Sequence, residues 1–252
     1  MTKTILTIAS ALLLLAACGK KEAPQAEKAT DNYLKRQPGD STLYRLACDG
    51  TTDSLLVLLP YTGADPDTFD IINASQQKQI FGKPFIGDEL AVILNPEDKA
   101  EALTVINLDD LKGQWAFMVK PKLRDYDKMS RRLRRRMMAE MPDSVKESLL
   151  VPREYVLQFK RGYSMTTRGM KHQQTTDEMS AVVYPEIKRY TEWRLFNGKL
   201  IMASGTMEMP SGTKGTKQKI DRDTCRIVEL TKDTLVLRFS DGDWSFYRKK
   251  NN

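Results

Sequence analysis

The sequence is poor in the residues that build metal centres, catalytic triads and disulfide scaffolds. Among its 252 residues it has one histidine and three cysteines. The histidine, His172, lies in a polar stretch, and no local spacing supplies the further ligands that a metal site needs. No Gly-x-Ser-x-Gly motif is present to supply a serine nucleophile for a triad. We therefore predict that His172 lies in a surface loop, that the protein is not an enzyme, and that it holds no metal or other cofactor.

The cysteines are too few and too far apart for a disulfide framework. Cys48 and Cys225 fall in two separately patterned blocks of the sequence, and Cys48 has no second cysteine at C-x-x-C spacing. We predict two separate buried thiols. The alternative, a bond between them, would require the two blocks to pack within the ~7 Å Cα separation that a disulfide allows.

Long apolar runs are confined to the N-terminus. Residues 5–15 form an apolar run that follows Lys3 and is too short to cross a membrane as a helix, as in a secretory signal peptide over residues 1–17. The junction Leu15-Ala16-Ala17-Cys18 resembles a bacterial lipobox. That resemblance implies cleavage before Cys18, acylation of its thiol with chains such as palmitate, and a lipid anchor. An ordinary signal peptide with a chance cysteine is the alternative.

The segment after the cysteine has little to bury. Residues 18–41 are rich in Lys, Glu, Ala, Gln, Pro and Asp, which predicts a flexible tether. Lys20 follows Gly19 at the place where an inner-membrane retention signal would have Asp. By resemblance to sorted lipoproteins, this predicts the outer membrane, on its periplasmic or its cell-surface face.

Positive charge is concentrated in one segment. Nine basic and two acidic residues lie between Lys120 and Met138, while the formal net charge of the whole chain is +7. The rest of the chain is therefore close to neutral. Because the positive charge is confined to one segment and is not spread over the surface, nucleic-acid binding is disfavoured. We expect a monomer.

Short strands separated by turns predict a mainly β fold with a small N-terminal domain over residues 42–108. The fully apolar run at residues 55–59 is typical of a strand buried on both faces. Further strands are predicted at residues 68–72, 90–94 and 103–107. About six strands in so short a block indicate a small closed or half-open barrel.

Residues 109–250 predict a second, larger β domain. Asn197-Gly198 is the sequence of a type I′ hairpin turn, and residues 240–243 form a second hairpin turn. Strands are predicted on both sides of each turn, at residues 113–119, 155–160 and 226–230, and around 216–219. Eight or more strands joined by short turns favour an up-and-down barrel over a sandwich.

A helical insertion is predicted at residues 127–150 of this barrel. Met129, Leu133, Met137 and Met141 recur every four residues, which is one apolar stripe on a helix. Asp127 is the expected N-cap and Pro142 the expected end, with a second short helix after it. The other faces carry five arginines, which either solvate the helix or bind an anionic partner such as lipid headgroups: Arg131, Arg132, Arg134, Arg135 and Arg136.

Part of this second block is similar to a known family. Gly113-x-Trp115 resembles the Gly-x-Trp motif of lipocalins. From Leu111 onward, the chain is similar to the lipocalin-like lipoprotein domains common in Bacteroidales, through Trp115, Phe159, Trp193-x-x-x-Asn197-Gly198-Lys199-Leu200-Ile201 and the pattern from Asp223 to Leu237. The resemblance implies a calyx-like barrel and carries over no catalytic residue.

Two functions are compatible with these features. The barrel binds a small apolar or amphipathic ligand, with Trp115, Phe159 and Trp193 as candidate contacts, or the protein is a non-catalytic envelope adaptor. The adaptor would bind a protein, a cell-wall polymer or anionic headgroups through its surface and its basic helix. A connected cavity of ~300 Å³ or more in the barrel favours the first function, and a filled core favours the second.

Overall fold

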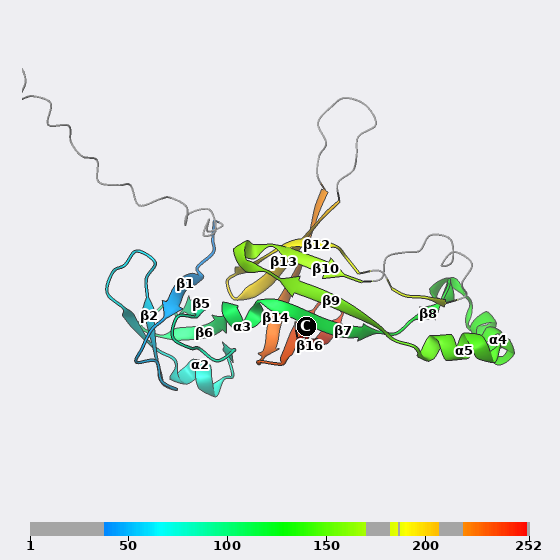
Figure 1. Cartoon of the computed structure of the whole chain (residues 1–252), viewed down its shortest axis with the longest axis horizontal. Coiled ribbons are helices and arrows are strands. Elements are labelled where there is room, and N and C mark those ends of the chain that lie inside the picture. Colours follow the sequence, from blue (N-terminus) through cyan, green and yellow to red (C-terminus); the bar gives the residue numbers. More distant parts are fainter. Residues whose placement is uncertain (1–37, 170–181, 186, 207–218, 251–252) are drawn as a thin grey trace, which may run out of the picture. The chain divides into compact units, whose positions relative to one another are not determined.

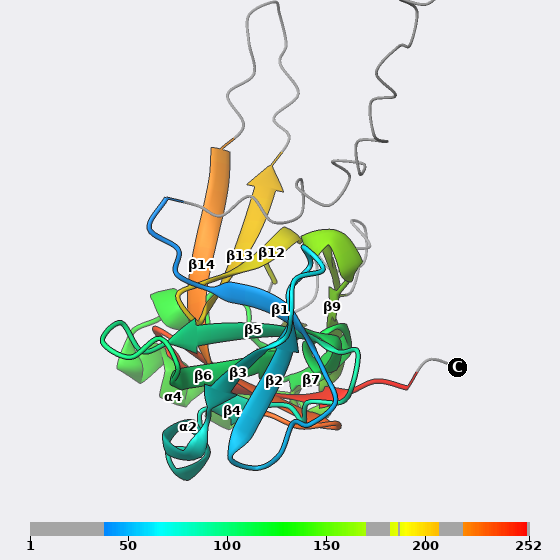
Figure 2. The ribbon, with the colours of Figure 1, turned by 90° about the vertical axis from the view of Figure 1, so that its left-hand side faces the viewer.

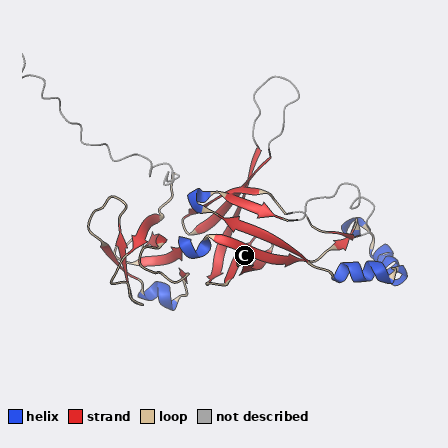
Figure 3. Cartoon of the chain, in the orientation of Figure 1, coloured by secondary structure: helices blue, strands red, loops and turns tan. Residues whose placement is uncertain are grey.

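The computed structural model describes residues 38–169, 182–185, 187–206 and 219–250, which belong to one compact unit, Gln37–Asn252 (Figure 1). The signal peptide, Cys18, most of the tether and His172 lie outside the described residues. The fold is mainly β, as predicted, with one mixed six-stranded sheet, one antiparallel eight-stranded sheet and few helices (Figure 3). No helix in the described part of the chain is both long enough and apolar enough to cross a membrane.

The first sheet has six strands in the order β3-β2-β1-β5-β6-β4. Figure 2 shows these strands, and the sheet curls so that Asp70 at the end of the edge strand β3 forms a bridge with Glu101, just before β6. The sheet is therefore a half-open barrel, and the helix α2 packs against β6. The elements are β1 (Leu43–Ala47), β2 (Leu55–Leu59), β3 (Asp67–Asp70), α2 (Ile72–Gln76), β4 (Ile80–Phe81), β5 (Glu89–Leu94) and β6 (Ala102–Asn107).

Two details of this sheet differ from the predictions. Leu56 and Leu58 on β2 are fully buried, but Leu55 is 44% exposed, so the strand has one inner and one outer face. The prediction of burial on both faces is wrong, because a strand of a small barrel turns every second side chain outward. The strand predicted at residues 68–72 ends at Asp70, whose side chain accepts a hydrogen bond from the Ile72 N–H where α2 begins.

The second sheet has eight strands in the order β10-β9-β7-β16-β15-β14-β13-β12 and forms the predicted up-and-down barrel. The first and last strands, β7 and β16, pair with each other. The sheet edges, β10 and β12, approach each other at a bridge between Ser164 and Glu192, so the barrel is nearly closed. The strands are β7 (Gly113–Val119), β9 (Arg153–Phe159), β10 (Met165–Arg168), β12 (Tyr190–Phe196), β13 (Lys199–Thr206), β14 (Lys219–Leu230), β15 (Thr234–Phe239) and β16 (Gly242–Arg248).

The hairpin predictions for this barrel are confirmed. Asn197 and Gly198 both have positive φ angles, 48° and 74°, as a type I′ turn requires. Ser240 and Asp241 join β15 to β16. The strand predicted at residues 226–230 is the end of the longer strand β14, which contains a bulge there, whereas residues 216–218 of the other predicted strand lie outside the described residues.

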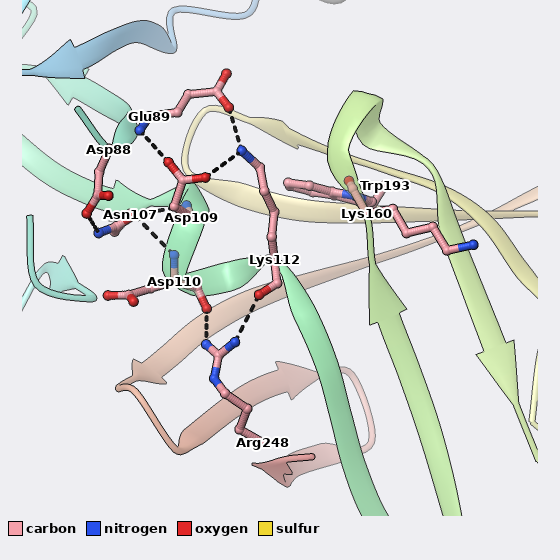
Figure 4. A network of polar contacts seen from close by, with 9 residues as sticks. All are labelled: Asp88, Glu89, Asn107, Asp109, Asp110, Lys112, Lys160, Trp193 and Arg248. Atoms are coloured by element: carbon pink, nitrogen blue, oxygen red, sulfur yellow. Dashed lines mark hydrogen bonds and ion pairs between the residues drawn. The ribbon is translucent and has the colours of Figure 1, made fainter. Parts of the chain in front are cut away.

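A short helix, α3 (Leu108–Leu111), joins the two sheets and is held by a polar network (Figure 4). Asn107 is fully buried, and its side-chain oxygen caps α3 by accepting from the backbone N–H groups of Asp109 and Asp110 at 2.9 and 3.1 Å. Its amide group donates to Asp88 and to the carbonyl oxygen of Lys83. Hydrophobic residues of both sheets lie in one core cluster around this helix. The two sheets therefore pack as one body.

The insertion between β7 and β9 is helical, as predicted. It contains β8 (Lys122–Leu123), a 3₁₀ turn at Tyr126–Lys128, α4 (Arg131–Glu140) and α5 (Asp143–Leu150), and β8 pairs with β11 (Val182–Val183). Ser130, not Asp127, is the N-cap of α4, because its hydroxyl accepts from the Leu133 N–H at 3.3 Å. Asp127 instead pairs with Lys122. Pro142 separates the two helices, as predicted.

Both described cysteines are free thiols. Cys225 is buried, and burial raises the pKa of its thiol to about 12. Cys48 is only half-buried, so the prediction of a fully buried thiol is wrong at this position.

Candidate ligand cavity of the barrel

One half of the barrel is filled by the aromatic residues that the sequence proposed as ligand contacts. Trp115, Phe159 and Trp193 are at most 1% exposed. The Trp115 indole N–H donates to the carbonyl oxygen of Leu111 at 2.8 Å. The indole N–H of Trp193, which is drawn in Figure 4, donates to the carbonyl oxygen of Lys160 at 3.2 Å. Phe159 meets the Trp193 ring edge-on, with 5.5 Å between centroids. All three are core residues, and none lines the cavity described below.

The Gly-x-Trp motif has a structural role at this filled end. Gly113 has a φ of +131°, a conformation that L-residues rarely adopt. A Cβ atom at this position would lie 2.7 Å from the guanidinium group of Arg248, which itself stacks on Trp115. The motif therefore lets the last strand approach the first strand and closes this end of the barrel.

The other half of the barrel holds a cavity of about 390 Å³. This volume lies within the range of small-molecule sites in proteins. The lining residues come from β7, β9, β12, β14, β15 and β16, from the segment that leads into β12 and from the turn between β15 and β16. They are Phe117, Val119, Tyr155, Leu157, Pro185, Ile187, Lys188, Tyr190, Asp223, Phe239, Ser240, Asp241, Trp244 and Phe246.

Six of the fourteen residues that line the cavity are aromatic. The Phe117 ring lies 5.0 Å from Phe246, 5.5 Å from Trp244 and 5.8 Å from Tyr155, measured between centroids. The Tyr155 hydroxyl donates to the carbonyl oxygen of Pro185 at 2.8 Å, which holds the segment before β12 against β9. These edge-to-face and tilted contacts give a wall of fixed shape.

A charged group stands at the edge of this apolar wall. The Lys188 ammonium lies 2.7 Å from Asp223 and 2.9 Å from Asp221. The Tyr190 hydroxyl donates to the other oxygen of Asp223 at 2.6 Å. Burial, followed by the Asp223 carboxylate, raises the pKa of Tyr190, and hydrogen bonds to Asp223 and Asp221 raise the pKa of Lys188. At neutral pH the phenol and the ammonium are therefore both protonated.

The sequence contained a partial signal for this cavity. Because side chains alternate along a strand, an inward Trp115 also turns Phe117 and Val119 inward. Lys188, Asp223 and their neighbours gave no such signal, since they come from distant segments that only the closed barrel brings together.

The arginines proposed to bind an anionic partner are on α4, outside the cavity. Four of them are exposed: Arg131, Arg132, Arg135 and Arg136. Arg134 is half-buried, stacks on the Tyr126 ring with 4.6 Å from Cζ to the centroid, and donates to the Asp127 carbonyl oxygen.

Within the described ranges, no group of three or more His, Cys, Asp or Glu side chains is placed to hold a metal ion. No protein-family model, curated protein or solved structure matches the chain. The chemistry of the cavity and of the helical insertion therefore carries the functional argument.

Proposed function

We propose that this protein is a lipid-anchored envelope protein that binds a small, mainly apolar ligand in the open half of its barrel. The observation that carries this proposal is the cavity of about 390 Å³ with its wall of Phe117, Tyr155, Trp244 and Phe246. A filled core would have favoured the adaptor alternative. An open half lined by aromatic side chains favours the ligand-binding function.

The polar edge of the cavity indicates what kind of ligand fits. An ammonium group has three N–H donors, and Asp223 and Asp221 occupy two of those on Lys188. The third can bind a carbonyl, hydroxyl or carboxylate oxygen of a ligand. We therefore propose an amphipathic ligand, with an apolar body against the aromatic wall and an oxygen acceptor at Lys188.

The lipobox resemblance and the lipocalin-like pattern support the setting of this function. Acylation of Cys18 would anchor the chain at the outer membrane, and membership of the lipocalin-like lipoproteins of Bacteroidales would account for a barrel with one open end. Small apolar molecules dissolve poorly in water, so a binding protein in the envelope would have them as natural cargo.

The experiment is a binding titration with the fluorescent apolar probe N-phenyl-1-naphthylamine, excited directly, followed by displacement with fatty acids, sterols and quinones. Val119 lines the cavity, whereas the preceding residue, Met118, is 52% exposed on the outer face of β7. Val119→Trp should fill the cavity and weaken probe binding about tenfold or more. Met118→Trp is the matched control and should bind as the unmodified protein does.

Failure to bind the probe, or equal binding by the two tryptophan variants, would contradict a ligand site in this cavity. Circular dichroism spectra and melting curves of both variants establish that they are folded. A ligand that displaces the probe should also raise the melting temperature, because it binds only the folded state.

A further inference from the structure

The helical insertion is joined to the strands that line the cavity. β7 ends at Val119 in the cavity wall, and the chain then passes through α4 and α5 (Figure 1). After α5, the carbonyl oxygen of Val151 accepts from the Tyr184 hydroxyl at 2.7 Å, and Arg153 stacks on the Tyr184 ring with 3.6 Å from Cζ to the centroid. Tyr184 directly precedes Pro185, another lining residue. The insertion thus adjoins the open half of the barrel.

Several apolar side chains of this insertion are exposed, whereas Met129, Met137, Val145 and Leu149 are half-buried. α4 has no buried residue, and of its predicted stripe Leu133 is 46% exposed, while Met141, just past the helix, is buried. Leu150 and Val151, at the end of α5, are 78% and 57% exposed. The alternative interpretation, in which the arginines only solvate a helix whose apolar stripe is packed, does not explain the exposed apolar side chains. Exposed apolar side chains on both helices of one insertion are a feature of interaction sites.

The arginines of α4 have few partners. Arg136 lies 3.0 Å from Glu140. Across the described parts of the chain, no acidic side chain forms an ion pair with Arg131, Arg132 or Arg135. Among the described residues, no ion pair offsets the positive potential of these three neighbouring guanidinium groups.

The positions of these arginines are unfavourable for the helix itself. Arg131 and Arg132 occupy the first turn of α4, where the positive end of the helix dipole favours acidic residues, and that turn contains none. A role in stabilising α4 therefore does not explain them. An external anion would relieve both the mutual repulsion and the unfavourable dipole interaction.

We propose that α4 and α5 dock on the surface of a bilayer that contains anionic phospholipids. Guanidinium groups bind phosphate through paired hydrogen bonds, and exposed apolar side chains enter the boundary between headgroups and acyl chains. A membrane fits both features at once, whereas an acidic protein face would satisfy only the arginines. Docking would place the open half of the barrel close to the bilayer, a consequence that rests on the proposed ligand function. The docking itself does not depend on that function.

The test uses the chain from Gly19 onward, which contains the whole compact unit and no acylated cysteine. Its binding to phosphatidylcholine vesicles with and without phosphatidylglycerol is measured by co-sedimentation. Replacing the four exposed arginines of α4 with glutamine should weaken binding to the anionic vesicles about tenfold or more, because each basic residue near such a surface adds to the affinity. The matched control removes the same charge from four exposed arginines of the barrel, Arg161, Arg168, Arg222 and Arg226, and should keep most of the binding.

A second pair of variants tests the apolar contribution. Leu150→Ser with Val151→Ser should weaken binding, whereas Phe85→Ser with Ile86→Ser should leave it unchanged. Phe85 and Ile86 are also exposed, at 59% and 72%, but they lie between β4 and β5 of the other sheet. This contrast separates insertion into the bilayer from simple charge attraction.

Three outcomes would overturn the proposal: no binding to anionic vesicles, equal loss of binding in the α4 and the control arginine variants, or full binding by all variants. The last two would leave an acidic protein as the partner to test. N-phenyl-1-naphthylamine binding is measured on the same variants and should not change, since none of the altered residues lines the cavity. A failure of the docking proposal can therefore be distinguished from a failure of the ligand-binding proposal.

Discussion

The guanidinium group of Arg248 lies over the indole ring of Trp115, with 4.2 Å between its Cζ atom and the ring centroid. The two residues are also register partners in the pairing of β16 with β7. Arg248 donates to the carbonyl oxygen of Lys112 at 2.9 Å and to those of Asp110 and Lys232. One side chain thus ties together the two strands that close the barrel and the short helix that leads to the other sheet.

Replacing Arg248 with alanine should lower the free energy of unfolding by about 2–4 kcal/mol. A hydrogen bond from a charged donor contributes about 1.5–3 kcal/mol, the contributions are not additive, and the stacked ring adds about 0.5–2 kcal/mol. Urea denaturation measures the change. Arg226→Ala, an exposed arginine on β14, is the control and should shift stability by less than about 0.5 kcal/mol. A similar small shift for Arg248→Ala would mean that its contacts contribute little.

Gly113→Ala should destabilise the barrel by about 2 kcal/mol or more. The substitution forces a side chain into a φ of +131° and brings its Cβ atom to 2.7 Å from Arg248. Gly205 in β13 is a suitable control, because nothing lies within 4 Å of the Cβ atom that an alanine would add there. Thermal melting of the two variants gives the comparison. Equal melting temperatures would show that Gly113 is dispensable.

Features set by local chemistry were predictable from the sequence. Asn197-Gly198 predicted its turn because a type I′ turn needs two successive residues with positive φ, which asparagine and glycine accept more readily than most residues. Pro142 predicted the break between α4 and α5. The N-cap was misplaced because Asp127 and Ser130 are equally good capping residues. Which of them caps depends on where the chain enters the helix from β8.

The open cavity could not be predicted in the same way. The alternation of side chains along β7 indicated that Trp115, Phe117 and Val119 face inward. It did not indicate that the barrel is filled around Trp115 and open around Val119. Filling depends on the summed volume of side chains from strands that are distant in sequence. The aromatic residues of the family-like pattern, Phe159 and Trp193, therefore proved to be core, whereas Trp244 in a hairpin strand lines the site.

The anchor prediction concerns Cys18, which precedes the described residues. Cys18→Ser should yield unprocessed or soluble protein, because acyl chains are what hold such a protein at a membrane. Cell fractionation followed by immunoblotting measures the distribution, and metabolic labelling with a palmitate analogue tests the acylation itself. If the serine variant still fractionates with outer membranes and resists extraction without detergent, the lipobox assignment is wrong.

Trp244 should be the tryptophan that reports ligand binding. It lines the cavity and is 38% exposed, whereas Trp115 and Trp193 are buried in the filled half with their indole N–H groups already bonded. A quinone in the cavity should quench part of the tryptophan fluorescence, and Trp244→Phe should remove most of that quenching while leaving the affinity within about threefold. Quenching that persists in Trp244→Phe would place the bound quinone elsewhere.

The pH dependence of stability should reveal Tyr190. Its pKa in the folded protein is raised above the ordinary value of about 10, first by burial and then by the Asp223 carboxylate. A raised pKa means that the phenol binds its proton more tightly in the folded than in the unfolded state. The resulting stabilisation is fully present below about pH 10 and is lost as the pH rises toward the folded-state pKa, because the unfolded state ionises first.

Tyr190→Phe removes the ionisable group but keeps the ring. Between about pH 9 and pH 11, the melting temperature of the unmodified protein should therefore fall more steeply than that of Tyr190→Phe. Asp223→Asn should give an intermediate slope, because it removes the carboxylate but leaves Tyr190 buried. If the melting temperatures of the unmodified protein and of Tyr190→Phe fall equally with pH across this range, Tyr190 has the same pKa in the folded and unfolded protein. Its hydroxyl would then not be held at the cavity edge by Asp223.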